Sequence, residues 1–304
     1  MTRKLNVLLV CKSDWANVAY EYSQALKSIG VDAVAIIGHK HSLGYPHQGI
    51  VARNPAKIKK YAIKADVIHY MHSQKVDLGG IDINNKAVVV SHTGSAYRNR
   101  SGRLNKIFNP IVQATIVGGC LGGKGAKNEH WLSGGIVDAK SLTPSYERIG
   151  NKIVIGHYPS SVLTKKSADI KKAINLLSGN FIYRTGERVP WIKNMARFRL
   201  CDIYVERLTS APRGFGISAI EAAAVGKIVI TSFSLIKEYK ENVGTYTPYI
   251  AQTVNGLRDK LLEIMALSEE EQLEKRKEMR EWVIKCHSYE AVGNRLLKVY
   301  NSIL

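Results

Sequence analysis

Two glycines and a glutamate in residues 201–231 have the spacing of an anion-binding site. The stretch resembles a strand end, a loop with Gly214 and Gly216, a helix from Ile217 to Val225, and another strand. In such a turn, unpaired backbone N–H groups and the positive end of the helix dipole point at an anion. Glu221 lies about one turn inside the helix, where its carboxylate can accept hydrogen bonds from ligand hydroxyls. An ordinary α/β unit has the same pattern, so the spacing alone leaves both interpretations open.

Cations in the second half of the chain strengthen the anion-binding interpretation. Lys165 and Lys166 follow another predicted strand, and Arg213 lies in the turn itself. This set suits a nucleotide diphosphate, with the cations on the phosphates and Glu221 on the ribose hydroxyls. The sequence has no D-x-D motif, so we expect neither a metal nor a bound cofactor. Side-chain cations and the helix dipole would then neutralise the charge of the leaving group.

The first half of the chain has a candidate histidine at a strand end. His92 directly follows a predicted strand, and in a doubly wound sheet such loops face the ligand. An aromatic residue and four cations come next: Tyr97, Arg98, Arg100, Arg103 and Lys106. We expect these residues to bind an anionic acceptor. The alternatives are a structural histidine and a solvated helix face.

The glycine-rich segment 118–125 resembles a second phosphate-binding motif. Its sequence fits G-x-x-x-x-G-K but continues with Gly125 instead of Ser or Thr. The hydroxyl that binds Mg²⁺ in a P-loop is therefore missing, and the sequence argues against a P-loop NTPase.

Strands and helices alternate along the chain and predict parallel sheets. A strand, a helix and a strand follow one another within residues 5–37, and a second α/β series opens near Lys152. Residues 131–149 have no clear period. We therefore predict two domains, 1–148 and 149–304, with the last helix a candidate to pack back on the first domain.

Composition adds a constraint on the partner. The 304 residues include 44 Lys and Arg against 25 Asp and Glu, a net charge of +19. Such a charge favours a polyanionic partner, although some soluble proteins are simply basic. The four cysteines form no C-x-x-C motif, which is typical of reduced thiols in a cytoplasmic protein. No segment approaches the roughly 18 apolar residues of a membrane span.

Several segments together resemble one protein family. Residues 213–231, R-G-F-G-I-S-A-I-E-A-A-A-V-G-K-I-V-I-T, resemble the E-G-F-G-x-x-x-x-E-A-M-A-x-G-x-P-V-I motif of family 4-type glycosyltransferases. Residues 156–165 resemble the H-A-P-S-N-x-x-x-K segment of some members, and 92–98 resemble their H-G-S-x-x-R loop. H-S-Y-E at 287–290 resembles the start of their last helix. The resemblance implies the GT-B fold, in which two Rossmann-like domains with parallel sheets face each other across a crevice.

The resemblance also implies an activity. A member of this family would be a retaining transferase that moves a sugar from a nucleotide-diphosphate sugar, such as a UDP- or GDP-sugar, to a hydroxyl. It implies catalytic roles for His92, Arg213 and Lys165. The implied donor-binding residues are Ser160, Lys166, Gly214, Phe215, Gly216, Ile217 and Glu221.

The motif differs from the family pattern at two positions. Arg213 replaces the first glutamate, which contacts the donor sugar, and Ile228 replaces the proline. Either Arg213 turns toward the diphosphate, or the change marks altered donor choice or lost activity. Retention and the identity of the sugar both depend on this position.

Three hypotheses remain for the acceptor. The charge favours a nucleic acid, with a hydroxymethylated base of phage-type DNA first; such a base would have to leave the stack. The alternative is a glycolipid or polysaccharide of the cell envelope, reached through a membrane-facing helix at 56–65, with Ile58, Tyr61 and Ile63 as its apolar anchors. A non-catalytic nucleic-acid-binding module on this scaffold is the third.

Overall fold

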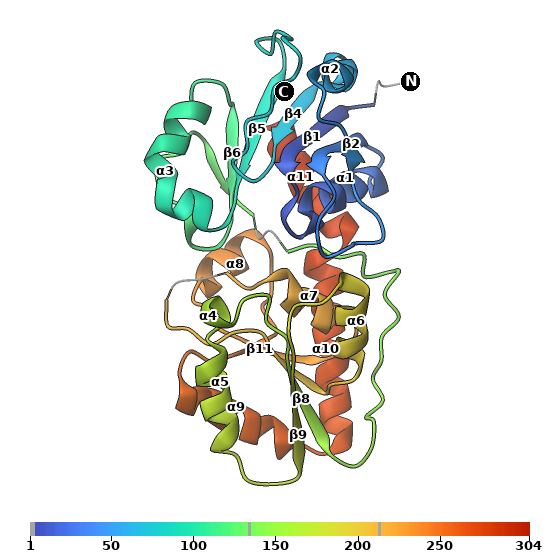
Figure 1. Ribbon diagram of the computed structural model, residues 1–304, viewed down its shortest axis with the longest axis vertical. Helices are drawn as coiled ribbons and strands as arrows, with labels where there is room; N and C mark the ends of the chain where they lie inside the picture. Colours follow the sequence, from blue (N-terminus) through green and yellow to red (C-terminus); the bar gives the residue numbers. More distant parts are fainter. Residues whose placement is uncertain (1–3, 133–134, 212–213) are drawn as a thin grey trace. The chain divides into compact units, whose positions relative to one another are not determined.

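The structure is a computed structural model that describes residues 4–132, 135–211 and 214–304. The chain forms two compact units (Figure 1). The first contains residues up to 136 together with 289–304, and the second contains 137–288. The chain therefore passes between units at 136 and again at 288. The sequence prediction placed the boundary at 148, with the last helix as a candidate to pack back on the first domain.

The first unit contains a parallel sheet in the order β3-β2-β1-β4-β5-β6-β7. The strands are β1 (Asn6–Ser13), β2 (Asp32–His39), β3 (Ile50–Val51), β4 (Val67–Tyr70), β5 (Ala87–His92), β6 (Ala114–Val117) and β7 (Glu129–Trp131). The central strand β1 pairs with β2 and β4, so that Val7 lies between Ala33 and Val67. Strands β4, β5 and β6 are buried along their whole length, because helices cover both faces of a parallel sheet.

Among the described residues of this unit, four α-helices cover the sheet. They are α1 (Val18–Ser28), α2 (Pro55–Lys64), α3 (Gly94–Phe108) and α11 (Tyr289–Asn301). Ile58 of α2 and Phe108 of α3 share one core with Leu8 and Val10 of β1, so both helices lie on the same face.

The last helix, α11, lies beside α1 (Figure 1). A Cβ on Gly293 would collide with the Ala25 carbonyl, so only glycine permits this approach. Tyr300 anchors the helix, because its hydroxyl lies 2.8 Å from Nδ1 of the buried His69. Nε2 of His69 lies 2.7 Å from the hydroxyl of Ser91.

The second unit contains a parallel sheet in the order β12-β11-β10-β8-β9. The strands are β8 (Ile153–His157), β9 (Phe181–Thr185), β10 (Ile203–Val205), β11 (Ile228–Thr231) and β12 (Tyr249–Ile250). Its α-helices are α4 (Val162–Lys165), α5 (Ser167–Asn175), α6 (Trp191–Arg199), α7 (Ile217–Ala224), α8 (Ile236–Asn242), α9 (Val254–Met265) and α10 (Glu269–His287).

Helix α10 begins at a capping box formed by Ser268 and Glu271, which satisfies two backbone N–H groups that would otherwise lack partners. Further along, Arg276 donates to Asp202 at 2.8 Å and ties the helix to the start of β10. The alanine-rich α7 packs against α10. In the described part of the chain, no helix combines the length and the hydropathy that crossing a bilayer requires.

Candidate functional site

The site in the second unit begins at the carboxyl end of β8, where His157 fixes two loops. His157 is fully buried, and its Nδ1–H donates a hydrogen bond of 2.8 Å to the Val205 carbonyl oxygen. Nε2 lies 2.8 Å from the Ser167 hydroxyl at the start of α5. Burial lowers the pKa of His157, in agreement with a neutral ring that accepts from Ser167. The imidazole thus joins the ends of β8 and β10 to the helix that follows Lys165.

Lys165 ends the short helix α4, and its side chain turns inward. The Ser161 side chain begins this helix by accepting a hydrogen bond from the Thr164 amide. Lys166 has a left-handed backbone with φ of 56°, which separates α4 from α5. Lys165 is consequently buried, whereas Lys166 is exposed, so the two neighbouring cations are not equivalent.

A buried carboxylate that the sequence analysis missed organises the cations. Glu206 follows β10 and is completely buried. Its Oε1 accepts a hydrogen bond from Lys165 Nζ. The same oxygen accepts two hydrogen bonds from Arg207, at 3.0 Å from Nε and at 2.9 Å from Nη2. Its Oε2 accepts from the Thr231 hydroxyl at 2.6 Å. Burial alone would raise the pKa of Glu206, but Lys165 and Arg207 hold it at about 2, so the carboxylate is ionised.

The N-terminus of α7 lies against this charged group. Gly216 is its N-cap residue and has no side chain to cap the helix. A Cβ on Gly216 would lie 2.7 Å from Glu206 Oε1 and 3.0 Å from Lys165 Nζ, so the position requires glycine. The free amides of a helix N-terminus and the two cations therefore meet at one place, as an anion-binding site requires.

Glu221, which the sequence predicted as a hydroxyl-binding carboxylate, lies further along α7. It is buried, and its Oε1 accepts a hydrogen bond of 2.6 Å from the indole Nε1 of Trp191 in α6. Trp191 was not identified from the sequence, because nothing in its local pattern separates it from a core residue. A carboxylate beside an indole ring provides both a hydroxyl acceptor and an apolar face.

The other predicted residues of this unit occupy different environments. Ser160 is exposed, and Gly214 and Ile217 are half-buried. Phe215 packs into an aromatic cluster, with ring centroids 5.2 Å from Phe233 and 5.7 Å from Trp282. Arg213, predicted to be catalytic, lies outside the described residues.

In the first unit, His92 ends β5 and is buried. Its Nδ1 lies 2.9 Å from the Ser73 hydroxyl, and its Nε2 has no hydrogen-bond partner among the described residues. The ring stacks on Tyr97 with centroids 4.0 Å apart, and the Tyr97 hydroxyl donates to Asn105. Burial lowers the pKa of His92 to about 4, so the imidazole is neutral near pH 7. Tyr97 is fully buried behind the histidine and is not exposed to solvent.

The cations predicted to bind the acceptor follow on α3. Arg100, Arg103 and Lys106 are exposed, and Arg98 is half-buried. The helix is irregular at Arg100, where φ is −138°. This part of the first unit thus carries exposed positive charge on the helix that begins directly after His92 and Thr93.

Backbone amides in and next to the glycine-rich segment 118–125 donate hydrogen bonds to a side chain of the protein itself. The Glu129 carboxylate accepts from the amides of Gly123 and Ala126, at 2.7 and 3.1 Å. These amides are therefore not available to a phosphate, which agrees with the missing P-loop hydroxyl.

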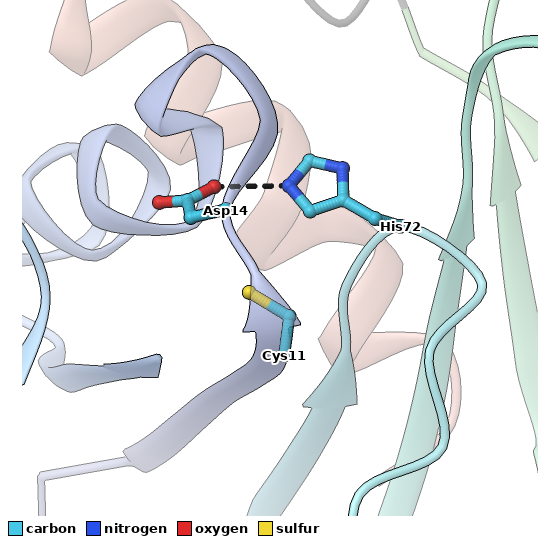
Figure 2. A group of neighbouring side chains, drawn as sticks. All are labelled: Cys11, Asp14 and His72. Carbon is cyan, nitrogen blue, oxygen red and sulfur yellow. Dashed lines mark hydrogen bonds and ion pairs between the residues drawn. The ribbon is translucent and has the colours of Figure 1, made fainter. Parts of the chain in front are cut away.

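Cys11, Asp14 and His72 form a buried cluster that the sequence analysis did not identify, because His72 is far from the other two in the chain (Figure 2). Their potential ligand atoms lie within 4.8 Å of one another, and thiol, carboxylate and imidazole are groups that bind zinc. Asp14 already accepts from the amides of Ala19 and Tyr20 at the start of α1 and lies 2.9 Å from His72 Nε2. The hydrogen bonds give the cluster a role in holding the loops after β1 and β4.

Two units that each contain a parallel sheet and helices define an α/β fold, and solved structures of similar fold are known. A scan of family models finds no match, and a search of curated proteins finds none. Among solved structures, HepE from Anabaena in complex with UDP-glucose aligns with a TM-score of 0.68 at 12% identity, covering 98% of this chain and 100% of HepE. A glycosyltransferase from Rickettsia africae gives 0.67 at 14%, covering 99% of both chains.

A third similar structure is the sucrose-phosphate synthase of Thermosynechococcus elongatus, with a TM-score of 0.65 at 13% identity, covering 98% of this chain and 99% of the synthase. These likenesses confirm the predicted fold class: the chain has the GT-B fold of two Rossmann-like domains, similar to family 4-like glycosyltransferases. Identities this low establish the fold and leave the chemistry to the residues.

Proposed function

We propose that this chain is a glycosyltransferase that uses a nucleotide-diphosphate sugar. The observation that carries the proposal is the meeting of Lys165, Arg207 and the N-terminus of α7, with Glu221 about one turn further along the helix. Cations and helix amides suit a diphosphate, and a buried carboxylate suits ribose hydroxyls. HepE, a protein of the same fold, has been crystallised with UDP-glucose.

In the proposed reaction, the bond between the sugar carbon C1 and the diphosphate oxygen breaks, and the diphosphate leaves with the bonding electrons. A new bond forms between C1 and the acceptor oxygen, and the proton of the acceptor hydroxyl passes to the leaving diphosphate oxygen. Lys165, Arg207 and the dipole of α7 stabilise the charge that develops on the diphosphate. His92, neutral and with an unpartnered Nε2 among the described residues, is the proposed acceptor-side group.

We extend the proposal to retention of the sugar's configuration without a metal. In support, the side-chain cations can supply the positive charge for which other enzymes use Mg²⁺. Full turnover in EDTA and an unchanged anomeric configuration in the product, observed by NMR, are expected. Loss of turnover that Mg²⁺ restores would contradict the first part, and an inverted product would contradict the second.

For the acceptor we propose an anionic molecule that carries a hydroxyl, with a hydroxymethylated DNA base as the first to be tested. The support is the net charge of +19 and the exposed cations Arg100, Arg103 and Lys106 on α3. Another protein of this fold, TarM, has been crystallised with fondaparinux and α-GlcNAc-glycerol, so anionic glycans belong in the same experiment. Action in the cytoplasm is part of the proposal, because Cys11, Cys120, Cys201 and Cys286 are thiols that form no disulfide with one another.

The membrane-surface alternative has less support. It needs apolar anchors on α2, but Ile58 is buried in the core and Tyr61 is half-buried. Ile63 alone of the three candidates is exposed, beside Lys64. One apolar side chain gives weak insertion, so binding to anionic vesicles would depend on charge and vanish at high salt.

The test is incubation with UDP- and GDP-sugars and three acceptors: hydroxymethylated DNA, unmodified DNA and an anionic glycan. Mass spectrometry of the products identifies the acceptor. Transfer to hydroxymethylated DNA but not to unmodified DNA is expected. Transfer to the glycan alone would replace the DNA hypothesis. DNA binding without binding of any nucleotide sugar would favour the non-catalytic module.

A further inference from the structure

Glu206 is saturated with donors and therefore acts as a holder of other groups. Its Oε1 accepts from Lys165 and twice from Arg207, and its Oε2 accepts from Thr231. A carboxylate has about four lone-pair positions, so little capacity remains for a ligand or a proton. The three charged groups together carry a net charge of +1, which leaves the site attractive to an anion.

The two cations keep donors that the described part of the chain does not use. An ammonium has three N–H donors, and the one recorded bond of Lys165 Nζ goes to Glu206. Arg207 uses Nε and Nη2 on Glu206, and its Nη1 makes no hydrogen bond to any described residue. Both side chains are largely buried, with 9% and 12% of their surfaces exposed. Arg207 Nη1 is not among the fully buried side-chain atoms that lack a partner, so this donor stays accessible to a ligand oxygen.

These donors lie at the N-terminus of α7. A Cβ built on Gly216 would be 3.0 Å from Lys165 Nζ and 3.5 Å from Arg207 Nη2. The planar guanidinium suits this position, because one edge can hold Glu206 while the rest of the fork faces a second oxyanion. The exposed Lys166, one of the three cations that the sequence predicted at this site, makes no hydrogen bond or ion pair with this group in the described part of the chain.

We propose that Arg207 is a second phosphate-binding cation of the donor site, acting with Lys165 and held in position by Glu206. The inference rests on the proposed function, because it takes the ligand to be a nucleotide diphosphate. It assigns a ligand-binding role to Arg207, and to Glu206 the role of a positioning residue that does not itself touch the ligand.

Calorimetric titration with UDP and with uridine tests Arg207, because the two probes differ only in the phosphates. R207Q should weaken UDP binding about ten- to hundred-fold and leave uridine binding unchanged, since one charge-assisted contact is lost. R258Q is the matched control: it removes the same charge from α9, where Arg258 pairs with Asp259, and should change neither affinity. R207K keeps the charge but loses the fork, so it should weaken UDP binding less than R207Q does.

The outcomes separate this inference from the proposed function. If the wild-type chain binds neither UDP nor GDP, the proposed function fails and the inference fails with it. If the wild type binds UDP and both R207Q and R207K bind it equally well, the inference alone is overturned. Should R207Q fail to fold, as judged by circular dichroism, R207K decides, because it preserves the buried positive charge.

A double-mutant cycle tests Glu206. E206Q should weaken UDP binding in the wild-type chain and weaken it less in the R207Q chain, because part of the effect of Glu206 acts through Arg207. Uridine affinity should stay constant throughout, which a general loss of structure would not allow. If the losses of UDP-binding free energy caused by E206Q and R207Q are additive in the double variant, the positioning role of Glu206 is overturned.

Discussion

At the scale of single residues, Glu221 and Arg207 have proposed roles that one pair of ligands can separate. Glu221 is expected to contact the ribose, which uridine and UDP share, whereas Arg207 is expected to contact the phosphates. The hydrogen bond from Trp191 to Glu221 gives an optical signal for the ribose side.

Glu221→Ala should weaken the binding of uridine and UDP by a similar factor, about ten-fold, because a buried carboxylate that accepts hydroxyl hydrogen bonds is lost. Calorimetric titration, together with Trp191 fluorescence, measures the two affinities. W191F is the control: it retains the carboxylate and should keep most of the affinity. Donor hydrolysis at wild-type rate in Glu221→Ala would contradict the assignment.

Glu206 predicts how stability responds to acid. Its pKa lies at about 2 in the folded chain, below the ordinary value of 4.5, so its stabilising effect is complete above pH 4.5 and is lost as the pH falls toward 2. E206Q should lower the free energy of unfolding by about 3–5 kcal/mol at pH 7, because two buried cations lose their partner. Urea unfolding at a series of pH values should show the difference from wild type narrowing below pH 4.5. A constant difference would contradict the ion pair.

At the scale of elements, α7 and the strand ends around it form the site through close approach of the backbone. Gly216 is the point of contact: an added Cβ would lie 2.7 Å from a carboxylate that three neighbouring residues hold in place. A side chain at this N-cap position would therefore force the neighbouring groups to shift.

Gly216→Ala should lower the free energy of unfolding by about 1–3 kcal/mol through overpacking, and should weaken UDP binding. Gly102→Ala in α3 is the matched control, because a Cβ there meets nothing within 4 Å. In a helix this exchange should stabilise by about 0.5–1 kcal/mol. Thermal and urea unfolding give the stability of each variant. Equal changes in the free energy of unfolding for Gly216→Ala and Gly102→Ala would contradict the packing argument.

At the scale of the whole molecule, the two ends of the chain belong to one unit. Helix α11 lies against α1, with Gly293 at the Ala25 carbonyl and Tyr300 on His69. Removal of this helix would expose the apolar face of α1 and leave His69 with one partner fewer.

A chain ending at 288 should therefore lose stability in the first unit and keep it in the second. Hydrogen exchange measured by mass spectrometry should show lost protection in β1, β4 and α1, with β8 and β10 unchanged. Gly293→Ala should have a weaker effect of the same kind, because its Cβ forces the two helices apart. Uniform loss of protection in both units would contradict the assignment of α11 to the first.

The sequence by itself predicted much of this protein. Strands β4 (Val67–Tyr70) and β6 (Ala114–Val117) coincide with short, mostly apolar runs of the sequence, because strands buried on both faces of a sheet carry few polar side chains. The alternation of strands and helices predicted the parallel sheets, and the resemblance of the motifs to family 4-type glycosyltransferases implied the GT-B fold. The two-residue strands β3 and β12 were missed, since so short an edge strand has no period of its own.

Tertiary structure decided which residues meet. Glu206 and Arg207 looked like an ordinary strand end until folding brought Lys165 and Thr231 to them, and Trp191 reaches Glu221 across 30 residues of chain. Lys165 and Lys166 are adjacent in sequence, yet a left-handed residue buries one and exposes the other. Local patterns record the period of an element, whereas a site forms from long-range pairings that only the packed sheet specifies.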